Sequence, residues 1–376
     1  MPHRKSPFFL RCPTHSLIRV NGSWLRLVRL ACAVLLLGLG EGCGSSEELA
    51  PVEGSRYSML ALGDTGNEEI LAPLLGGQMA VAQAMVDEAE ERPVDALIFL
   101  GDNFYWDGLG RENMVARIQE NLVAPYCYFL RLDGPRSDEV EQSCGVPEED
   151  RSPIPLYALL GNHDFILPES PMLQREVVPE FLPDWHVGSG LTEVIELTEG
   201  ISLILFQSDV DLWDVEGIGR EMARAIREAK GPWRILASHR PIATNDLGQK
   251  ILGGFPGFVL KGIQEGGLPV QLVLAGHHHS LQIFETLEPI QALHVGAGSG
   301  SHAKPPLARD HPDVRFSRME LGFARIDWVG EGEGERLIVT LTETAPWPIV
   351  SVLDPPKRVA RFAVDLDGRV SSLGIR

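Results

Sequence analysis

Positive charge is scarce in this chain. Its 376 residues include 33 Lys and Arg against 52 Asp and Glu, which gives a formal net charge of −19 at pH 7. No basic stripe follows the sequence, and a strongly negative surface repels polyanions. The composition therefore argues against nucleic acid as a partner.

Long hydrophobic runs are also missing. The apolar run Leu30–Leu39 is too short to span a bilayer comfortably as a mature helix, and it follows Arg26 and Arg29. This order is typical of a signal peptide for export, with cleavage near Gly42 and Cys43.

The end of this leader is compatible with two kinds of processing, lipidation of Cys43 or simple cleavage. The stretch Leu39-Gly40-Glu41-Gly42-Cys43 resembles a bacterial lipoprotein signal, from which Glu41 departs. A lipidated Cys43 would anchor the protein to a membrane, whereas simple cleavage would leave it periplasmic or extracellular. We expect a leader at 1–42, a polar linker at 43–55 and one domain at 56–376. Residues 1–42 carry six basic and one acidic side chain, so their removal lowers the net charge to −24.

Cysteine is rare, with five in the whole chain. Cys12, Cys32 and Cys43 belong to the leader or its end, which leaves Cys127 and Cys144 in an exported domain. Because oxidising compartments favour disulfides, we expect these two to pair and to stabilise the fold by about 3 kcal/mol. Two unpaired buried thiols are the alternative.

What the chain does contain is a set of short polar motifs, each placed at the end of an apolar run. The runs read as buried strands and span Met59–Leu62, Ala96–Leu100, Leu156–Leu160, Ile235–Ala237 and Gln271–Ala275. The motifs are Gly63-Asp64-Thr65-Gly66, Gly101-Asp102-Asn103-Phe104-Tyr105, Gly161-Asn162-His163-Asp164, Ser238-His239 and Gly276-His277-His278-His279. In open α/β sheets, ligands bind beyond the carboxyl ends of the strands, so the five motifs should converge on one site.

These side chains are of the kinds that a pair of metal ions requires. Two cations about 3.5 to 4 Å apart need a bridging carboxylate together with oxygen and imidazole donors from separate chain segments. A single Gly-Asp at a strand end is usually only a turn. The prediction of a metal site therefore depends on the ordered set.

The order of the motifs resembles that of the calcineurin-like metallophosphoesterases. Tyr105 narrows the resemblance to the purple acid phosphatases, and within them the tartrate-resistant type is most similar. The later Gly296-Ala297-Gly298 and Gly322-Phe323-Ala324 also stand in the order that this family shows. The resemblance covers roughly Arg56 to Val329. It implies an α/β fold, a two-sheet β-sandwich flanked by α-helices.

The same resemblance implies two ligand sets that share Asp102. One metal would be held by Asp64, Asp102, Tyr105 and His279, and the other by Asp102, Asn162, His239 and His277. The first set is rich in hard anionic oxygen, and a tyrosine with a free pKa of about 10 ionises only on a strongly Lewis-acidic cation, which favours Fe(III). The second set suits Fe(II), Zn(II) or Mn(II). An ordinary buried tyrosine is the alternative for Tyr105.

This site predicts hydrolysis of phosphate monoesters, as in an acid phosphatase. The cations would acidify a bound water and present it as hydroxide in line with phosphorus. His163 would protonate the leaving alkoxide, unless it only orients the metal ligands. The substrates would be small phosphorylated compounds. A phosphodiesterase or nucleotide hydrolase on the same site, a redox role for an iron pair, and a surface lipoprotein with a non-catalytic site are the alternatives.

The sequence departs from the tartrate-resistant pattern at Gly248, where that type carries a further histidine. This difference puts the substrate preference in doubt. Asp164 is expected to cap the following turn or to polarise a neighbour, and not to bind metal. The side chain of His278 should point away from its ligand neighbours. Surface or loop positions are expected for His186, His294, His302 and His311.

Outside the motifs, the periodicity predicts two amphipathic helices, a β-hairpin and a β-rich end. The helices are expected over 67–92, with a break near Gly76-Gly77, and over 215–229. The hairpin should pair 192–197 with 201–207. Further strands are expected at Leu281–Phe284, Ala292–Val295, Phe323–Trp328, Arg336–Thr342 and Val359–Val364, the last of which would end the fold.

Overall fold

The computed structural model describes residues 49–66, 77–209, 215–242, 255–286, 291–304, 313–348 and 350–376. All of them belong to one compact unit, Gly42–Arg376. Within the described residues, no helix combines the length and the apolar character that crossing a membrane requires.

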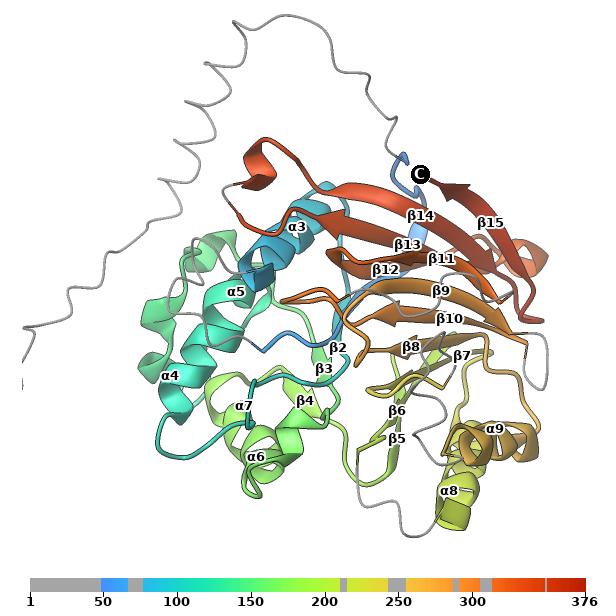
Figure 1. Ribbon diagram of the computed structural model, residues 1–376, viewed down its shortest axis with the longest axis horizontal. Helices are drawn as coiled ribbons and strands as arrows, with labels where there is room; N and C mark the ends of the chain where they lie inside the picture. Colours follow the sequence, from blue (N-terminus) through green and yellow to red (C-terminus); the bar gives the residue numbers. More distant parts are fainter. Residues whose placement is uncertain are drawn as a thin grey trace, which may run out of the picture. The chain divides into compact units, whose positions relative to one another are not determined.

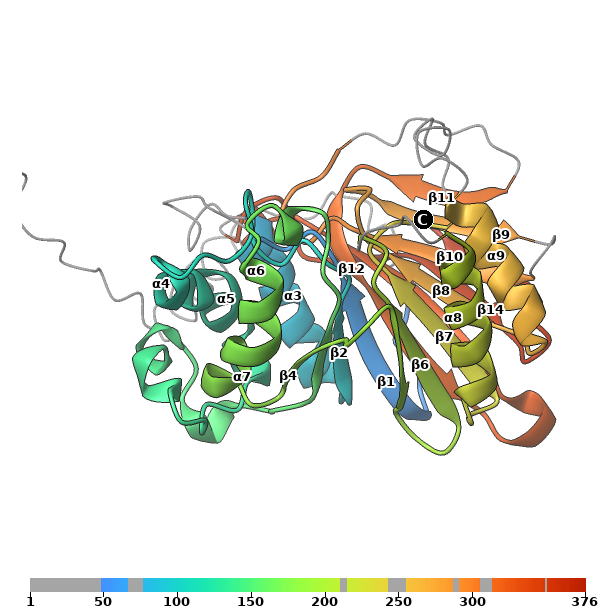
Figure 2. The same cartoon turned by 90° about the horizontal axis from the view of Figure 1, so that it is seen from below.

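Two β-sheets face each other across the main core (Figures 1 and 2). The first sheet has eight strands in the order β15-β14-β13-β12-β1-β2-β3-β4. Its strands are β1 (Ser55–Leu62), β2 (Ala96–Phe99), β3 (Leu156–Ala158), β4 (Trp185–Val187), β12 (Leu321–Val329), β13 (Arg336–Thr344), β14 (Lys357–Val364) and β15 (Val370–Ile375). β1 to β4 are parallel, and β12 joins β1 antiparallel.

The second sheet has seven strands in the order β11-β9-β10-β8-β7-β6-β5. Its strands are β5 (Thr192–Glu196), β6 (Ile201–Phe206), β7 (Trp233–Ser238), β8 (Leu272–Ala275), β9 (Leu281–Thr286), β10 (Ala292–Ala297) and β11 (Val314–Arg318). β6, β7, β8 and β10 run parallel, so the carboxyl ends of β7 and β8 lie at the same edge.

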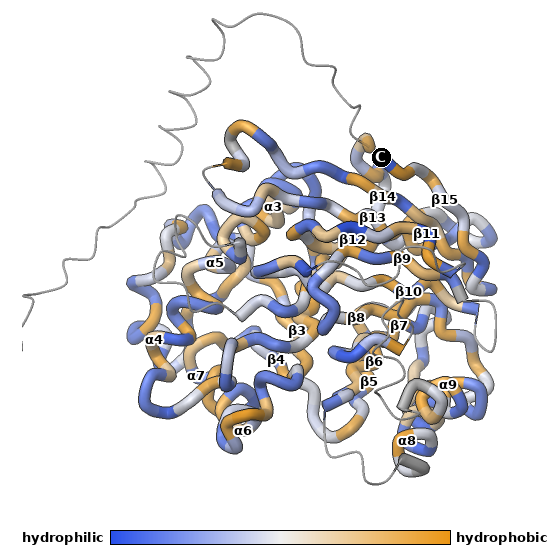
Figure 3. Tube along the Cα trace, in the orientation of Figure 1, coloured by the Kyte–Doolittle hydropathy of each residue, from blue (hydrophilic) through white to orange (hydrophobic). Residues whose placement is uncertain are grey.

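Alternation along the strands explains why the apolar runs are continuous. In β1, Met59 and Ala61 enter the core between the sheets, whereas Leu60 and Leu62 pack against the helices on the outer face. β6 divides in the same way, with Leu203 facing inward. Because side chains alternate across a strand, burial on both faces requires an unbroken apolar segment. Figure 3 shows this hydrophobic character along β7 and β8.

Helices cover the outer face of each sheet (Figure 2). On the first sheet these are α3 (Gly77–Glu91), α4 (Met114–Ile118), α5 (Ala124–Tyr126), α6 (Ser170–Met172) and α7 (Val178–Phe181), with π-helical turns at Gln119–Val123 and Leu173–Val177. The second sheet is covered by α8 (Val215–Glu228) and α9 (Phe255–Gly266). One-turn 3-10 helices lie at Cys127–Phe129, Ser137–Glu139, Glu141–Ser143, Glu148–Asp150, His163–Phe165, Gly332–Gly334 and Val350–Val352.

The predicted fold class, a two-sheet sandwich flanked by helices, is confirmed, as are the five strands before the motifs and the hairpin of β5 and β6. Of the helix expected over 67–92, residues 77–91 form α3, and 67–76 lie outside the described residues. The expectation that Val359–Val364 ends the fold was wrong, because β15 follows and pairs with β14. β15 is mostly exposed and lacks an apolar run, so no periodic signal marked it.

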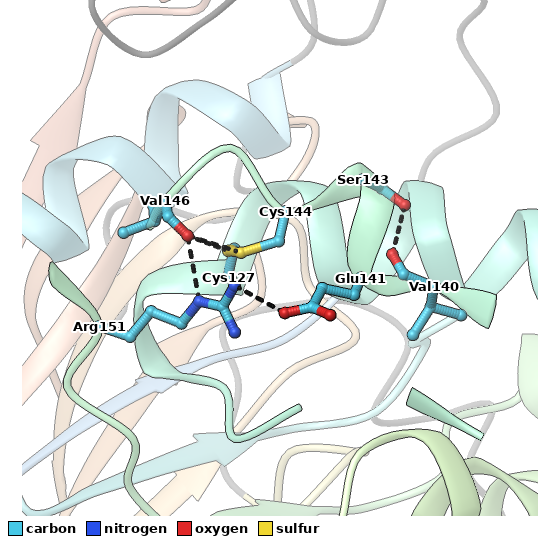
Figure 4. Close-up of a disulfide and its surroundings, with 7 residues drawn as sticks. All are labelled: Cys127, Val140, Glu141, Ser143, Cys144, Val146 and Arg151. Carbon is cyan, nitrogen blue, oxygen red and sulfur yellow. Dashed lines mark hydrogen bonds and ion pairs between the residues drawn. A yellow bond between two sulfur atoms is a disulfide. The ribbon is translucent and has the colours of Figure 1, made fainter. Parts of the chain in front are cut away.

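The expected disulfide is present. Cys127 and Cys144 are bonded, with Cα atoms 5.3 Å apart. Figure 4 shows Arg151 beside the bridge, where its Nε donates to the carbonyl of Val146 at 3.1 Å and its Nη2 to Glu141 at 3.3 Å. The bridge and this arginine together tie down the irregular segment between α5 and β3.

Candidate metal centre

The five predicted motifs meet beyond the ends of β1, β2, β3, β7 and β8. Backbone hydrogen bonds join the loops: the amide of Asp64 donates to Gly101 at 2.9 Å, and that of Gly66 donates to Asp102 at 3.0 Å. Across the second sheet, the amide of Gly276 donates to His239 at 3.0 Å. Backbone hydrogen bonds alone therefore hold these loops against one another.

Three of the candidate ligands have a left-handed backbone. The φ angles are 56° at Asp64, 53° at Asp102 and 66° at His277. Such angles are uncommon for residues other than glycine, and they cluster at functional sites, where the surrounding structure holds them. Here they turn three side chains away from their strands and toward a shared point.

The first cluster is centred on the phenol of Tyr105, which is buried. Its Oη lies 3.0 Å from Oδ1 of Asp64, 3.0 Å from Oδ2 of Asp102 and 3.4 Å from Nε2 of His279. Oδ1 of Asp64 also lies 3.3 Å from that imidazole nitrogen. Four donor atoms from three loops therefore face one another.

The second cluster is centred on Nε2 of His239. This atom lies 3.2 Å from Oδ1 of Asn162, 3.2 Å from Nδ1 of His277 and 3.5 Å from Oδ2 of Asp102. Nδ1 of His239 donates to the carbonyl of Leu100 at 2.8 Å, which leaves Nε2 as the acceptor in the neutral ring. Both clusters include the same oxygen of Asp102, so a single atom is shared between them.

The donor spacing fits metal ions. Two ligand atoms at about 2.1 Å from one cation and at right angles to each other are separated by about 3.0 Å, close to the spacings seen here. The phenol of Tyr105 has one hydrogen and cannot donate to Asp64 and Asp102 at once. A cation would resolve this conflict. Asp64, Asp102 and His239 by themselves form a group of donors that could hold a metal ion.

The electrostatics agree with this fit. Burial, followed by the charge of Asp102, raises the pKa of Asp64 to about 8. Burial and then the two carboxylates raise the pKa of Tyr105 far above its usual value. Burial disfavours a charged His239, but Asp102, Asp209 and Asp64 outweigh it and raise its pKa to about 9. Without a cation, burial and the neighbouring carboxylates thus disfavour the anionic forms of Asp64 and Tyr105, which a bound metal ion would stabilise.

Glycines leave room for the two carboxylates. A Cβ at Gly161 would overlap Oδ1 of Asp102, and one at Gly298 would come within 2.6 Å of Oδ2 of Asp64. Two glycines of the predicted motifs are therefore required by the close approach of backbone to carboxylate.

Asp164 is a structural centre and does not point into either cluster, as expected. It is buried, and its Oδ2 accepts from the amides of Gly161 at 2.9 Å and Asn103 at 3.1 Å. Its Oδ1 accepts from the amide of Phe104 at 3.2 Å and from Gln174 at 2.9 Å. One carboxylate therefore joins the Gly-Asp-Asn and Gly-Asn-His loops.

His163 lies at the rim of the site. Its amide donates to Oδ1 of Asp102 at 2.9 Å, and its Nδ1 donates to the carbonyl of Trp106 at 2.6 Å. The Trp106 side chain is 55% exposed beside it. This arrangement orients the ring of His163, whose Nδ1 is engaged by the carbonyl of Trp106.

The other histidines differ in how deeply they are buried. His186 is exposed and bonds to Glu193 at 2.9 Å, so its surface assignment is confirmed. The assignment was wrong for His294, which is buried in β10, where burial lowers its pKa to about 4. His278 is half-buried beside a small cavity lined by Ile242 and Gln282. His311 lies outside the described residues.

His302 lies in a loop, as expected, but this loop brings it beside the metal centre. Its ring centroid lies 4.0 Å from that of His279 and 5.1 Å from that of Tyr105. Lys304 accompanies it, with Nζ 3.5 Å from Nε2 of His279. No motif marked either residue, because both follow the family's Gly-Ala-Gly segment in a loop.

Arg240 and Asp209 were also missed. Arg240 directly follows His239, and its Nη1 lies 3.2 Å from Nε2 of His277. Asp209 accepts from Nε of Arg240 at 2.6 Å. Adjacency to a predicted ligand was the one available signal. Gly248, where the family pattern breaks, lies outside the described residues.

Comparison with known proteins identifies a family and a fold. Residues 57–281 match the family model of the calcineurin-like phosphoesterases. No curated protein matches the chain. Among solved structures, GAP50, the anchor in the inner membrane complex of Plasmodium, is 13% identical with a TM-score of 0.57, over 86% of this chain and 90% of that one.

Two further structures have the same fold. PhoD is 11% identical with a TM-score of 0.53, over 88% of this chain and 74% of that one. Purple acid phosphatase PPD1 from yellow lupin (Lupinus luteus) seeds is 15% identical with a TM-score of 0.50, over 79% of this chain and 53% of that one. At these identities the likeness extends to the fold alone.

Proposed function

This chain belongs to the calcineurin-like phosphoesterase family, and we propose that within it the protein hydrolyses phosphate monoesters, as an acid phosphatase does. The observation that carries the proposal is the single oxygen of Asp102 that faces both donor clusters, 3.0 Å from Tyr105 and 3.5 Å from His239. A shared carboxylate oxygen is what a two-metal hydrolytic centre needs.

Each of the two clusters would hold one metal ion. Asp64, Asp102, Tyr105 and His279 would hold Fe(III), and Asp102, Asn162, His239 and His277 would hold Fe(II), Zn(II) or Mn(II). Bound, the cations would lower the pKa of water and neutralise charge on the phosphoryl oxygens.

His163 is the proposed general acid. Because its Nδ1 donates to the carbonyl of Trp106, its Nε2 is the atom that can pass a proton to the leaving oxygen. The hydrogen bond from the backbone amide of His163 to Asp102 holds this residue against the metal centre. Proton transfer therefore takes place beside the site of attack.

The protein is proposed to act outside the cytoplasm, in the periplasm, the extracellular space or anchored through lipidated Cys43, which lies outside the described residues. The disulfide between Cys127 and Cys144 supports an oxidising compartment. The net charge of −19 supports small phosphorylated substrates over nucleic acid.

The deciding experiment is the visible spectrum of the unreduced protein, together with its metal content and its rate on p-nitrophenyl phosphate. We expect two metals per chain and a visible band that Tyr105→Phe abolishes, because the phenolate on Fe(III) would be its source. An active, colourless protein with zinc or manganese at both positions would overturn the iron assignment.

The alternatives are separated by a panel of monoesters, diesters and nucleotides. Faster turnover of diesters than of monoesters would replace the proposal with a phosphodiesterase. A metal-free, inactive protein would support a non-catalytic role, which the complete set of donor side chains argues against.

A further inference from the structure

The contact between Arg240 and His277 depends on which nitrogen of the imidazole carries the hydrogen. Nδ1 of His277 faces Nε2 of His239 at 3.2 Å, and its Nε2 faces Nη1 of Arg240 at 3.2 Å. Without a metal, both contacts can be satisfied when His239 is neutral: Nδ1–H of His277 donates to His239, and Nε2 accepts from the arginine.

A metal ion at the second cluster would change this contact. Nδ1 of His277 would then give its lone pair to the ion, so the hydrogen of the neutral ring would move to Nε2. Nε2–H and the N–H of Arg240 would then both be donors, so neither could accept from the other. Two donors aimed at one position form a site for an anion.

Arg240 is held in place for this task. Asp209, whose side chain is 5% exposed, accepts from Nε of Arg240 at 2.6 Å. Ser208 accepts from the amide of Arg240 at 2.8 Å and donates to the same aspartate at 3.0 Å. The guanidinium is thus anchored at Nε, and its Nη1 faces His277.

We propose that Arg240, oriented by Asp209, binds a terminal oxygen of the substrate phosphate together with Nε2–H of His277. This inference rests on the proposed function and deepens it. A phosphate monoester has three terminal oxygens and a diester has two. If each of the two cations took one terminal oxygen, only the monoester would have a third for Arg240. Arg240 is therefore a specificity residue for monoesters.

The test measures the affinity of the metal-loaded protein for inorganic phosphate by titration calorimetry. We expect Arg240→Ala to weaken it about tenfold to a hundredfold, the range for a charged hydrogen bond. Arg240→Lys keeps the charge but loses the planar guanidinium, and Asp209→Asn keeps the shape but loses the negative charge that holds it, so both should have intermediate affinities. Arg224→Ala, at a side chain on α8 that is 45% exposed, is the matched control and should bind as the wild type does.

Kinetics give a second readout. Arg240→Ala should raise KM for p-nitrophenyl phosphate more than for bis(p-nitrophenyl) phosphate. Unchanged phosphate affinity in Arg240→Ala, with both metals retained, overturns the inference. Loss of metal in step with affinity also overturns it, because Arg240 would then only support His277.

Failure of this inference can be told from failure of the proposed function. If the wild type is active and Arg240→Ala has the same affinity for phosphate, only the inference is refuted. A metal-loaded wild type that turns over no monoester refutes the proposed function, and the phosphate titration still reports on Arg240.

Discussion

The backbone amide of His277 donates a hydrogen bond to Oδ2 of Asp64 at 2.7 Å, across 213 residues of sequence. Asp64 follows β1 of the first sheet, and His277 follows β8 of the second. One oxygen of the carboxylate is thus held by backbone, and the other, Oδ1, faces Tyr105 and His279. The candidate metal centre is therefore built across both sheets and depends on how they pack.

The first prediction concerns Gly161, where the carboxylate of Asp102 needs space. In Gly161→Ala, the new Cβ would overlap Oδ1 of Asp102 and displace the shared carboxylate. We expect reduced metal content and about a hundredfold loss of kcat/KM, since small misplacements at a reacting centre have effects of this size. Gly145→Ala, where a Cβ meets nothing within 4 Å, is the matched control. Full metal content and activity in Gly161→Ala would contradict the assignment of Asp102.

The role of His163 predicts a dependence on the leaving group. His163→Asn should lower kcat about a hundredfold or more for alkyl phosphates such as glycerol phosphate, because the alkoxide needs a proton. For p-nitrophenyl phosphate the loss should be much smaller, since nitrophenolate leaves without one. Equal losses on both substrates, with metal retained, would show that His163 only orients the ligands.

The buried His294 predicts sensitivity to acid. Its pKa falls to about 4 on folding because burial disfavours the charged ring. The unfolded chain, with a histidine pKa of about 6.5, then binds more protons between these values, so stability is complete above pH about 6.5 and declines as pH falls toward 4. The loss from this residue should reach about 3 kcal/mol.

The variant His294→Gln isolates that contribution. At neutral pH this variant should have a lower free energy of unfolding than the wild type, as measured with denaturant. The difference between the two proteins should shrink as the pH is lowered to 4, because glutamine does not titrate. A deficit that stays constant over this range would mean that His294 is not the group responsible.

The disulfide predicts a stability difference without a change at the metal centre. Replacing Cys127 and Cys144 together by alanine should lower the free energy of unfolding by about 3 kcal/mol, the value for a loop of this length. Metal content should be unchanged. Dithiothreitol should destabilise the wild type by a similar amount and leave the double variant unaffected. An equal response in both proteins would refute the contribution of the bridge.

The local sequence was sufficient for the parts of the site that are carried by strand ends. Asp64, Asp102, Asn162 and His239 each follow an apolar run, and burial of a strand on both faces makes that run continuous and easy to read. The alternation of β1 between two cores follows from the same pattern. Short or exposed strands such as β4 and β15 have no such run, so they were not predicted.

The sequence by itself thus determined the fold class, the set of candidate donors and the strands that carry them, because strand periodicity and motif order are local properties. Only the tertiary structure placed His302 beside Tyr105 and joined Asp209, Arg240 and His277 into one contact. Those neighbours come from separate loops, and their distances depend on the packing of two sheets. Periodicity along a single strand does not predict that packing.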